Sequence, residues 1–309
     1  MTDSGTDRPV QLPQIDGVLV LDKPSGPTST RCLTAIKRLG QRKIGHAGTL
    51  DPMASGVLLV LLGQATKLSG YLLDGGLKVY RGSLLLGRET DTWDAEGALV
   101  AERDWTSVDA AGVEAAVASW NGVQEQAVPP YSAAKHEGQP LYRLARKGQP
   151  VPEKVKTVEI LQAEILSMDL PHVQFRVKCS SGTYIRSLAH SLGMRLGCGA
   201  VLTELTREYS HPFGLDRAVT LDAIRSRPDD LPSMVRPIAQ ALPGWPVIDA
   251  SPEEAARVRN GMTLPCPPSL LETVAANGGL ALLTEAGREL AIARLDARRA
   301  LTVARGLWR

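Results

Sequence analysis

The sequence has few aromatic residues and no long hydrophobic run. Aromatic side chains make up 4% of the 309 residues, with only two Phe, so Leu, Val and Ala must fill most of the core that a 43% apolar content allows. An apolar run of about 18 residues, as a membrane-spanning helix needs, is absent. An N-terminal apolar segment that would direct export is absent too. The composition therefore predicts a cytoplasmic protein that does not span a membrane.

Cysteine is also scarce. The four cysteines form no Cys-x-x-Cys pair and no Cys/His cluster at zinc spacing. This pattern predicts buried thiols in a reducing compartment. Phosphate-loop and dinucleotide-binding glycine patterns are missing, as is the Gly-x-Ser-x-Gly nucleophile elbow. We therefore expect neither a metal site nor a cofactor.

Charge is nearly balanced overall but unevenly distributed. The 35 Lys and Arg residues against 33 Asp and Glu residues give a net charge of +2. Three segments, residues 31–43, 135–156 and 288–309, are locally basic. Separate basic segments suit a polyanion laid across a broad face, although each segment alone also fits an ordinary solvated surface.

The most informative stretch is residues 43–67. Residues 45–52 (GHAGTLDP) precede the apolar run 57–62, which is bounded by glycine and predicts a buried strand. The proline after Asp51 disfavours helical backbone angles at the aspartate, and the two glycines allow a ligand to approach the backbone closely. We interpret residues 45–52 as a loop that presents one carboxylate at a strand edge. The alternative is a tight turn in which Asp51 only caps the backbone.

The periodicity of the remaining chain predicts an α+β fold. Strands are expected over residues 15–21, 77–86, 123–127, 154–168, 172–179 and 200–210, and helices over residues 28–39, 65–73, 106–120, 141–147, 184–196 and 251–260. Residues 87–97 are expected to form a long polar loop. Because strands and helices do not alternate strictly, we expect a mixed, largely antiparallel central sheet with flanking helices. A proline-rich segment, 228–246, separates this region from a small β-rich remainder.

Three side chains suggest a chemistry. Asp51 has the carboxylate that a nucleophile or base at a sugar or heterocyclic base requires. Arg186, at a predicted helix start, could hold that carboxylate ionised and aimed. Tyr80, in the middle of a predicted strand, could stack on an unstacked base and lend its hydroxyl to proton transfer. Spacing alone does not bring the three together.

An ordered set of motifs resembles the TruB family of tRNA pseudouridine synthases. Residues 45–52 with 54–58 (ASGVL) resemble its catalytic motif. The resemblance continues, in the family's order, over roughly residues 15–210, in the segments 22–26 (DKPSG), 63–67 (GQATK), the Tyr80 strand, 181–186 (SGTYIR), 196–200 (LGCGA) and 202–207 (LTELTR).

The resemblance implies isomerisation of uridine 55 in the TΨC loop of tRNA to pseudouridine, with the target base flipped out and without a cofactor. Asp51 would be the nucleophile or base, and the residues leave this choice open. Tyr80 would stack on the target base and serve in proton transfer. Arg186 would pair with Asp51.

The resemblance also implies substrate contacts. Tyr184 and Leu205 would line the uracil pocket. His46 would contact the RNA and help to hold the nucleotide out of its loop. Lys23 and Lys67 would support the site or the RNA backbone.

The implied architecture is a pseudouridine synthase fold followed by a PUA-like domain. A flexible N-terminus (1–14) would precede a catalytic domain (15–245) with an RNA-binding thumb insertion at about 128–152, and the PUA-like RNA-binding domain would cover 246–309. The expected partner is the T-arm stem-loop of tRNA, bound by a monomer that needs no protein partner.

Three alternatives remain open at this stage. A nucleoside or base-excision glycosylase would use the same carboxylate but release free uracil. An RNA-folding module would bind RNA without catalysis. A family relative that modifies RNA within a guide-RNA complex would share the motifs and differ in its substrate.

Overall fold

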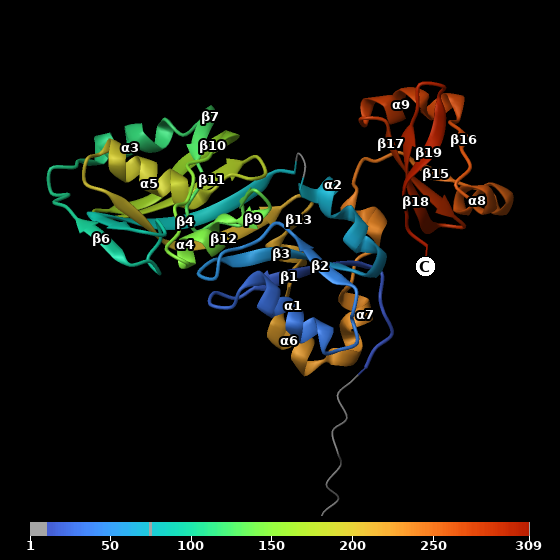
Figure 1. Ribbon diagram of the computed structural model, residues 1–309, viewed down its shortest axis with the longest axis horizontal. Coiled ribbons are helices and arrows are strands. Elements are labelled where there is room, and N and C mark those ends of the chain that lie inside the picture. Colours follow the sequence, from blue (N-terminus) through green and yellow to red (C-terminus); the bar gives the residue numbers. More distant parts are fainter. Residues whose placement is uncertain (1–10, 74–75, 309) are drawn as a thin grey trace, which may run out of the picture.

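The computed structural model describes residues 11–73 and 76–308. It consists of a large sheet flanked by helices and a smaller β-rich part at the C-terminal end (Figure 1). Most of the predicted N-terminal segment 1–14 lies outside the described residues, because only positions 11–14 are included.

The large sheet contains ten strands among the described residues. Its main path runs β14-β1-β3-β12-β4-β11-β10-β7, with β2 paired to β3 and β13 paired to β12. Neighbours are antiparallel except for β1 with β14 and β12 with β3. The strands are β1 Gly17–Lys23, β2 Ile44–Ala47, β3 Ser55–Leu62, β4 Lys78–Leu86, β7 Gly122–Ala127, β10 Val155–Asp169, β11 His172–Cys179, β12 Ala200–Ser210, β13 Phe213–Gly214 and β14 Val219–Thr220. The predicted mixed, largely antiparallel α+β sheet is thus confirmed.

One face of this sheet is covered by four helices. They are α1 (Ser29–Lys37), α3 (Ala110–Ala118), α5 (Ile185–Arg195) and α6 (Leu221–Ser226). Their apolar residues and those of β1, β3, β4, β11 and β12 form one continuous core. Helices α1 and α6 lie beside the half of the sheet that contains β1 and β3, whereas α3 and α5 lie beside the other half (Figure 1).

The apolar run in β3 lies at the centre of the molecule. Every residue from 57 to 62 is at most 1% exposed, as predicted for this run. The reason is that its two faces belong to two different cores: alternate residues pack under α1 or against the segment η1 (Gly63–Leu68) and α2 (Ser69–Leu73). The strand is therefore a rigid support for the loop before it.

The C-terminal part is a five-stranded sheet in the order β15-β17-β18-β19-β16. Its elements are β15 Val247–Asp249, α8 Pro252–Arg259, β16 Leu264–Pro265, η5 Pro268–Leu270, α9 Leu271–Ala276, β17 Leu280–Glu285, β18 Arg288–Leu295 and β19 Ala300–Gly306. Leu282, Ile292 and Leu307 from this part pack into the core on the second face of the large sheet. The predicted helix from Ser251 is confirmed as α8, which carries a complete capping box.

Shorter elements connect these layers. They are the hairpin strands β5 Arg88–Thr90 and β6 Leu99–Glu102, the small hairpin β8 Lys135–His136 and β9 Gln139–Pro140, the helix α4 Leu141–Arg146, and η2 Leu215–Arg217, η3 Pro228–Asp230, α7 Leu231–Met234 and η4 Ile238–Ala241. The hairpin β8–β9 and α4 fall within the predicted thumb segment, 128–152.

Three local predictions were wrong. Residues 44–47 form β2 rather than part of a loop, because they pair with β3. Part of the predicted polar loop 87–97 is β5, which pairs with β6. The helix predicted at 106–120 begins only at Ala110, because the Asp109 side chain caps it by accepting from the Gly112 amide.

The four cysteines are buried and form no disulfide, in agreement with the predicted thiols. In the described part of the chain, no helix is long and apolar enough to cross a membrane.

Candidate active site

Asp51 lies on a short loop between β2 and β3 that is anchored at both ends. On its N-terminal side, the Ser29 hydroxyl at the start of α1 donates to the Leu50 carbonyl at 2.9 Å and accepts from the Leu50 amide at 3.0 Å. The Asp51 side chain remains 36% exposed. The loop is therefore fixed while its carboxylate faces solvent.

Lys23 fixes the C-terminal side of the same loop. Its side chain is fully buried and donates to the carbonyls of Pro24, Pro52 and Ala54 at 2.9, 3.1 and 2.6 Å. Burial lowers the pKa of Lys23, and the charge of Asp51 is among the influences that oppose this shift. With all three N–H groups used by the backbone, Lys23 supports the loop, and a contact with RNA would break these bonds.

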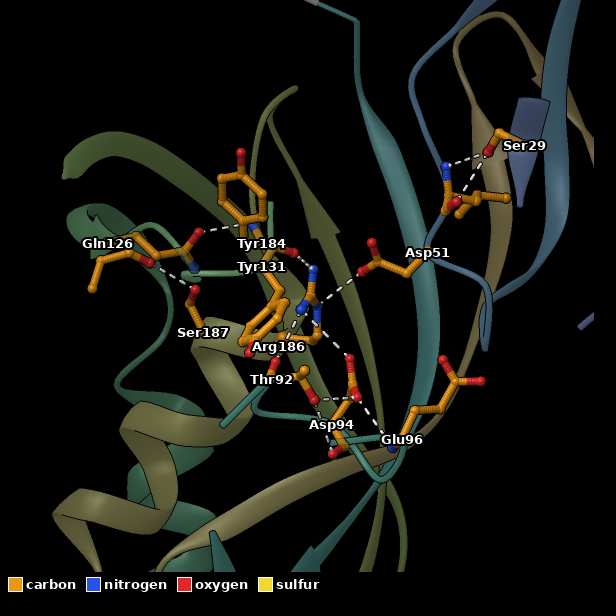
Figure 2. A network of polar contacts seen from close by, with 12 residues as sticks. Ser29, Asp51, Thr92, Asp94, Glu96, Gln126, Tyr131, Tyr184, Arg186 and Ser187 are labelled. Atoms are coloured by element: carbon orange, nitrogen blue, oxygen red, sulfur yellow. Dashed lines mark hydrogen bonds and ion pairs between the residues drawn. The ribbon is translucent and has the colours of Figure 1, made fainter. Parts of the chain in front are cut away.

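Arg186 joins the loop to helix α5. Its Nε lies 2.9 Å from Asp51 Oδ2, and its Nη1 lies 3.5 Å from Asp94 Oδ2. Nη1 also donates to the Thr92 carbonyl at 2.9 Å, and Nη2 donates to the Tyr131 carbonyl at 3.0 Å. Figure 2 shows the guanidinium surrounded by these acceptors. Since Arg186 is only 4% exposed, it is aimed as well as charged.

Asp94 is the second acid of this network. It is 5% exposed and accepts hydrogen bonds from the Thr92 hydroxyl at 2.6 Å and the Glu96 amide at 3.1 Å. Burial raises the pKa of Asp94, and the Thr92 hydrogen bond and the Arg186 charge partly offset the rise. Asp94 thus contacts the same arginine that pairs with Asp51.

Tyr80 lies on β4, with its neighbour Arg207 directly opposite on β12. Burial raises the pKa of Tyr80, and the Arg207 charge and a hydrogen bond from its guanidinium oppose the rise. Arg207 is fully buried and donates from Nε to the Val57 carbonyl at 2.7 Å and from Nη2 to the Gly48 carbonyl at 2.8 Å. It therefore binds both ends of the segment that carries Asp51.

Arg207 was not predicted as a site residue. Its only sequence signal is its position at the end of the motif 202–207, which says nothing about the carbonyls that it binds. The antiparallel pairing of β12 with β4 places it opposite Tyr80, although the register shifts after Leu202 and again after Arg207.

Tyr184 lies at the start of α5, and Leu205 lies on β12. Tyr184 is the residue before the helix, not within its first turn as predicted, and its amide donates to Gln126 Oε1 at 2.7 Å. Burial raises the pKa of Tyr184, and Asp51 adds to the rise through its charge. Leu205 is 7% exposed and belongs to the same core as Tyr80. Asp51 thus contacts Arg186 directly, and in addition to burial its charge raises the pKa of Tyr80 and Tyr184, which places these four residues in one group.

His46 and Lys67 lie outside that group. His46 is on β2, half-buried, and its pKa is lowered by burial and by the Arg207 charge. Lys67 donates to the Gly306 carbonyl on β19. Lys67 thus lies in the contact between the large sheet and the C-terminal part, rather than with Asp51.

A search of the described residues finds no group of three His, Cys, Asp or Glu side chains that could hold a metal ion. The polar groups that the site does contain are one half-exposed carboxylate, two buried arginines, one buried carboxylate and two tyrosines. This set can supply a nucleophile or base, fix its ionisation and transfer protons.

Solved structures with the same fold define the class. The chain aligns with a chain of a Cbf5-Nop10-Gar1 complex at a TM-score of 0.67 and 24% identity, covering 95% of this chain and 85% of that chain. It aligns with a chain of the archaeal box H/ACA sRNP Nop10-Cbf5 complex at a TM-score of 0.63 and 25% identity, covering 94% and 86%. The fold is the pseudouridine synthase fold.

Sequence comparison identifies the family. Residues 37–185 match the model of the TruB family pseudouridylate synthase N-terminal domain. The chain is 59% identical to tRNA pseudouridine synthase B of Nitratidesulfovibrio vulgaris strain Hildenborough, covering 96% of this chain and 99% of that protein. It is 43% identical to the enzyme of the same name from Syntrophotalea carbinolica, covering 90% and 92%. The chain belongs to the TruB family of pseudouridylate synthases, as the motifs predicted.

Proposed function

We propose that this chain isomerises uridine 55 in the TΨC loop of tRNA to pseudouridine, with Asp51 as the catalytic carboxylate. The observation that carries the proposal is the ion pair between Asp51 and Arg186, in which the arginine is buried and the carboxylate stays half-exposed. Family membership and relatives named tRNA pseudouridine synthase B support tRNA as the substrate.

The reaction conserves every atom of the nucleotide. The glycosidic bond from C1′ to N1 breaks, the uracil turns, and a bond from C1′ to C5 forms. C5 then loses its proton and N1 gains one, so substrate and product are isomers. The reaction consumes no oxidant, reductant or group donor, in line with the predicted absence of a cofactor.

Asp51 acts on the sugar of the target nucleotide in one of two ways. As a nucleophile it forms a bond to the sugar while the uracil detaches. As a base it removes the C2′ proton. Both roles require the ionised carboxylate, which the Arg186 guanidinium contacts from Nε at 2.9 Å.

The remaining predicted residues surround the base. Tyr80 stacks on the uracil and exchanges a proton with it, with Arg207 opposite it on β12. Tyr184 and Leu205 line the pocket. His46, on β2 just before the loop of Asp51, contacts the RNA and keeps the base outside the stack. Extruding a base costs a few kcal/mol, and less when it starts in a loop.

The wider architecture supports an RNA substrate. We propose that residues 128–152, with the hairpin β8–β9 and α4, are the thumb that closes on the T-arm, within a catalytic domain of residues 15–245. We further propose that residues 246–309 are the PUA-like RNA-binding domain. We expect a cytoplasmic monomer that modifies tRNA without a guide RNA or a protein partner.

The test uses an unmodified tRNA transcript and a T-arm stem-loop with the purified protein. We expect pseudouridine at position 55 in both RNAs, no free uracil, and no product when position 55 is cytidine. Release of uracil would identify a glycosylase instead. Modification at another uridine would overturn the assigned position while leaving the reaction type in place.

A further inference from the structure

Trp93 has an unusual backbone conformation next to the candidate active site. Its φ of +63° is in the left-handed region, which bulky side chains rarely adopt. Its indole ring stacks on the His190 ring with centroids 4.3 Å apart and an angle of 3° between the planes. Burial lowers the pKa of His190, so two neutral rings form this stack at pH 7.

The two neighbours of Trp93 both contact Arg186. The Thr92 carbonyl accepts from its Nη1, and the Asp94 carboxylate lies 3.5 Å from the same atom. His190 follows Arg186 by four residues on α5, so the two side chains project from the same face of the helix. Residues 92–94 therefore contact two residues of α5, Arg186 and His190, which lie one turn apart on the same face of the helix.

The backbone around Trp93 is also fixed by two hydrogen bonds. The Trp93 amide donates to the Thr90 carbonyl at 3.2 Å, and the Leu202 amide on β12 donates to the Trp93 carbonyl at 3.2 Å. Glycine would adopt this turn without steric cost. A tryptophan here must instead be held in a strained conformation by its surroundings, and its ring stacks on that of His190.

We propose that the stack of Trp93 on His190 is a positioning clamp for the Arg186 network. The clamp presses residues 92–94 onto α5, keeps Thr92 and Asp94 at the Arg186 guanidinium, and through it aims Asp51. The proposal rests on the proposed catalytic role of Asp51. Trp93 and His190 are positioning residues, and neither touches the reacting nucleotide.

Two substitutions separate the ring from the backbone shape. Trp93→Phe keeps an aromatic ring that can stack, whereas Trp93→Asn suits the left-handed backbone but has no ring. We expect Trp93→Asn to lower kcat about tenfold with KM for the T-arm RNA within about twofold, because a small misalignment is costly for catalysis. Trp93→Phe should retain most of the wild-type kcat.

The control is Trp245→Ala. Trp245 is likewise half-buried and contacts one aromatic ring, the edge-on Tyr71, but it lies in the second core. Thermal unfolding of every variant checks that the fold is retained. We expect Trp245→Ala to change the unfolding temperature without selectively lowering kcat.

The partner ring gives a second readout. His190→Phe should retain activity, whereas His190→Ala should lower kcat as much as Trp93→Asn does. The double variant Trp93→Asn/His190→Ala should lose no more kcat than either single variant. Combining Trp93→Asn with Asp94→Asn should also cost less than the two single effects multiplied together. Full activity of Trp93→Asn, or independent effects of the two ring variants, would overturn the clamp. A wild-type protein that makes no pseudouridine would overturn the proposed function instead.

Discussion

At the scale of single residues, Arg186 decides how the site works. It is buried, and its four polar contacts come from three segments of the chain: the loop of Asp51, the turn with Thr92 and Asp94, and Tyr131. The planar guanidinium can serve several acceptors at fixed angles, which an ammonium group cannot. The site therefore depends on the shape of this side chain as well as on its charge.

Replacing Arg186 by lysine should lower kcat about 100-fold while the protein still binds the T-arm RNA. The charge remains, but the fork that holds Asp51, Thr92 and Tyr131 together is lost. Single-turnover kinetics with a binding assay measure both quantities. Arg195→Lys, at the far end of the same helix, is the control and should be active. Wild-type kcat in Arg186→Lys would show that charge alone suffices.

Lys78 gives a prediction about pH. Burial, together with the nearby charges of Arg207 and Lys156, lowers the pKa of Lys78 from 10.5 to about 8. Between pH 8 and 10.5 the unfolded chain keeps a proton that the folded chain has released, so the free energy of unfolding rises with pH in this window. The contribution is about 3 kcal/mol.

Urea unfolding between pH 7 and 10.5 tests this effect. The free energy of unfolding of Lys78→Met should exceed that of the wild type at pH 7, and the difference should shrink as the pH rises. The exposed Lys178 lies one residue away on the neighbouring strand, and Lys178→Met should show no such trend. A difference that is constant with pH would contradict the assignment.

At the scale of elements, the segment from Gly48 to Val57 is held by contacts that are distant in sequence. Ser29 comes from α1, Lys23 from β1 and Arg207 from β12. Helix–strand packing alone would leave this segment free to move, because loops lack a repeating hydrogen-bond pattern of their own. The contacts of these three residues thus hold an irregular segment, and the carboxylate that it carries, in a fixed position.

Arg207→Met should lower the free energy of unfolding by about 3 kcal/mol, because two buried carbonyls lose charged donors. It should also lower kcat, since Asp51 and Tyr80 both lose a support. Arg81→Met is the matched control: Arg81 is adjacent to Tyr80 on β4, but its side chain is 56% exposed. Equal stability losses in the two variants would rule out a special role for Arg207.

Local sequence patterns explain what could be predicted. The buried strand β3 follows from its unbroken apolar run, and α8 follows from its capping box. The strand β2 could not be predicted, because residues 44–47 have no apolar alternation and are extended only through pairing with β3.

The candidate site shows the same division. Asp51, Tyr80 and Arg186 were predicted through motifs; the structure pairs Asp51 with Arg186 and places Tyr80 opposite Arg207, which binds the segment that carries Asp51. Arg207, which was not predicted, binds the Gly48 carbonyl, and Arg186 binds the carbonyls of Thr92 and Tyr131. These contacts could not be predicted, because a backbone carbonyl carries no sequence signal. Lys23 and Lys67 were named through two motifs, residues 22–26 and 63–67. The motifs did not indicate that each lysine binds backbone carbonyls.

At the scale of the whole molecule, the two sheets share a core. Leu282, Ile292 and Leu307 join the C-terminal part to the large sheet, so both parts can act on one RNA. Five arginines of the C-terminal basic segment are exposed among the described residues, at positions 288, 294, 298, 299 and 305. This surface suits phosphate groups of the tRNA outside the T-loop.

Removing three of these charges, in Arg294→Ala/Arg298→Ala/Arg305→Ala, should weaken binding of full-length tRNA and reduce the salt dependence of its affinity. Binding of the short T-arm stem-loop should change much less, and kcat should stay at the wild-type value. Filter binding over a range of salt concentrations measures the first two quantities. Equal weakening for both RNAs would place this surface at the T-arm instead.

The most direct test of the central claim is a single-turnover assay of Asp51→Asn on the T-arm stem-loop, with the affinity for the RNA measured in parallel. Asparagine keeps the size of the side chain and removes the ionised carboxylate that the proposed reaction requires. We expect wild-type affinity, no pseudouridine and no free uracil, while Asp216→Asn at an exposed position (74%) stays active. Pseudouridine formation by Asp51→Asn at the wild-type rate would show that catalysis does not depend on the Asp51 carboxylate.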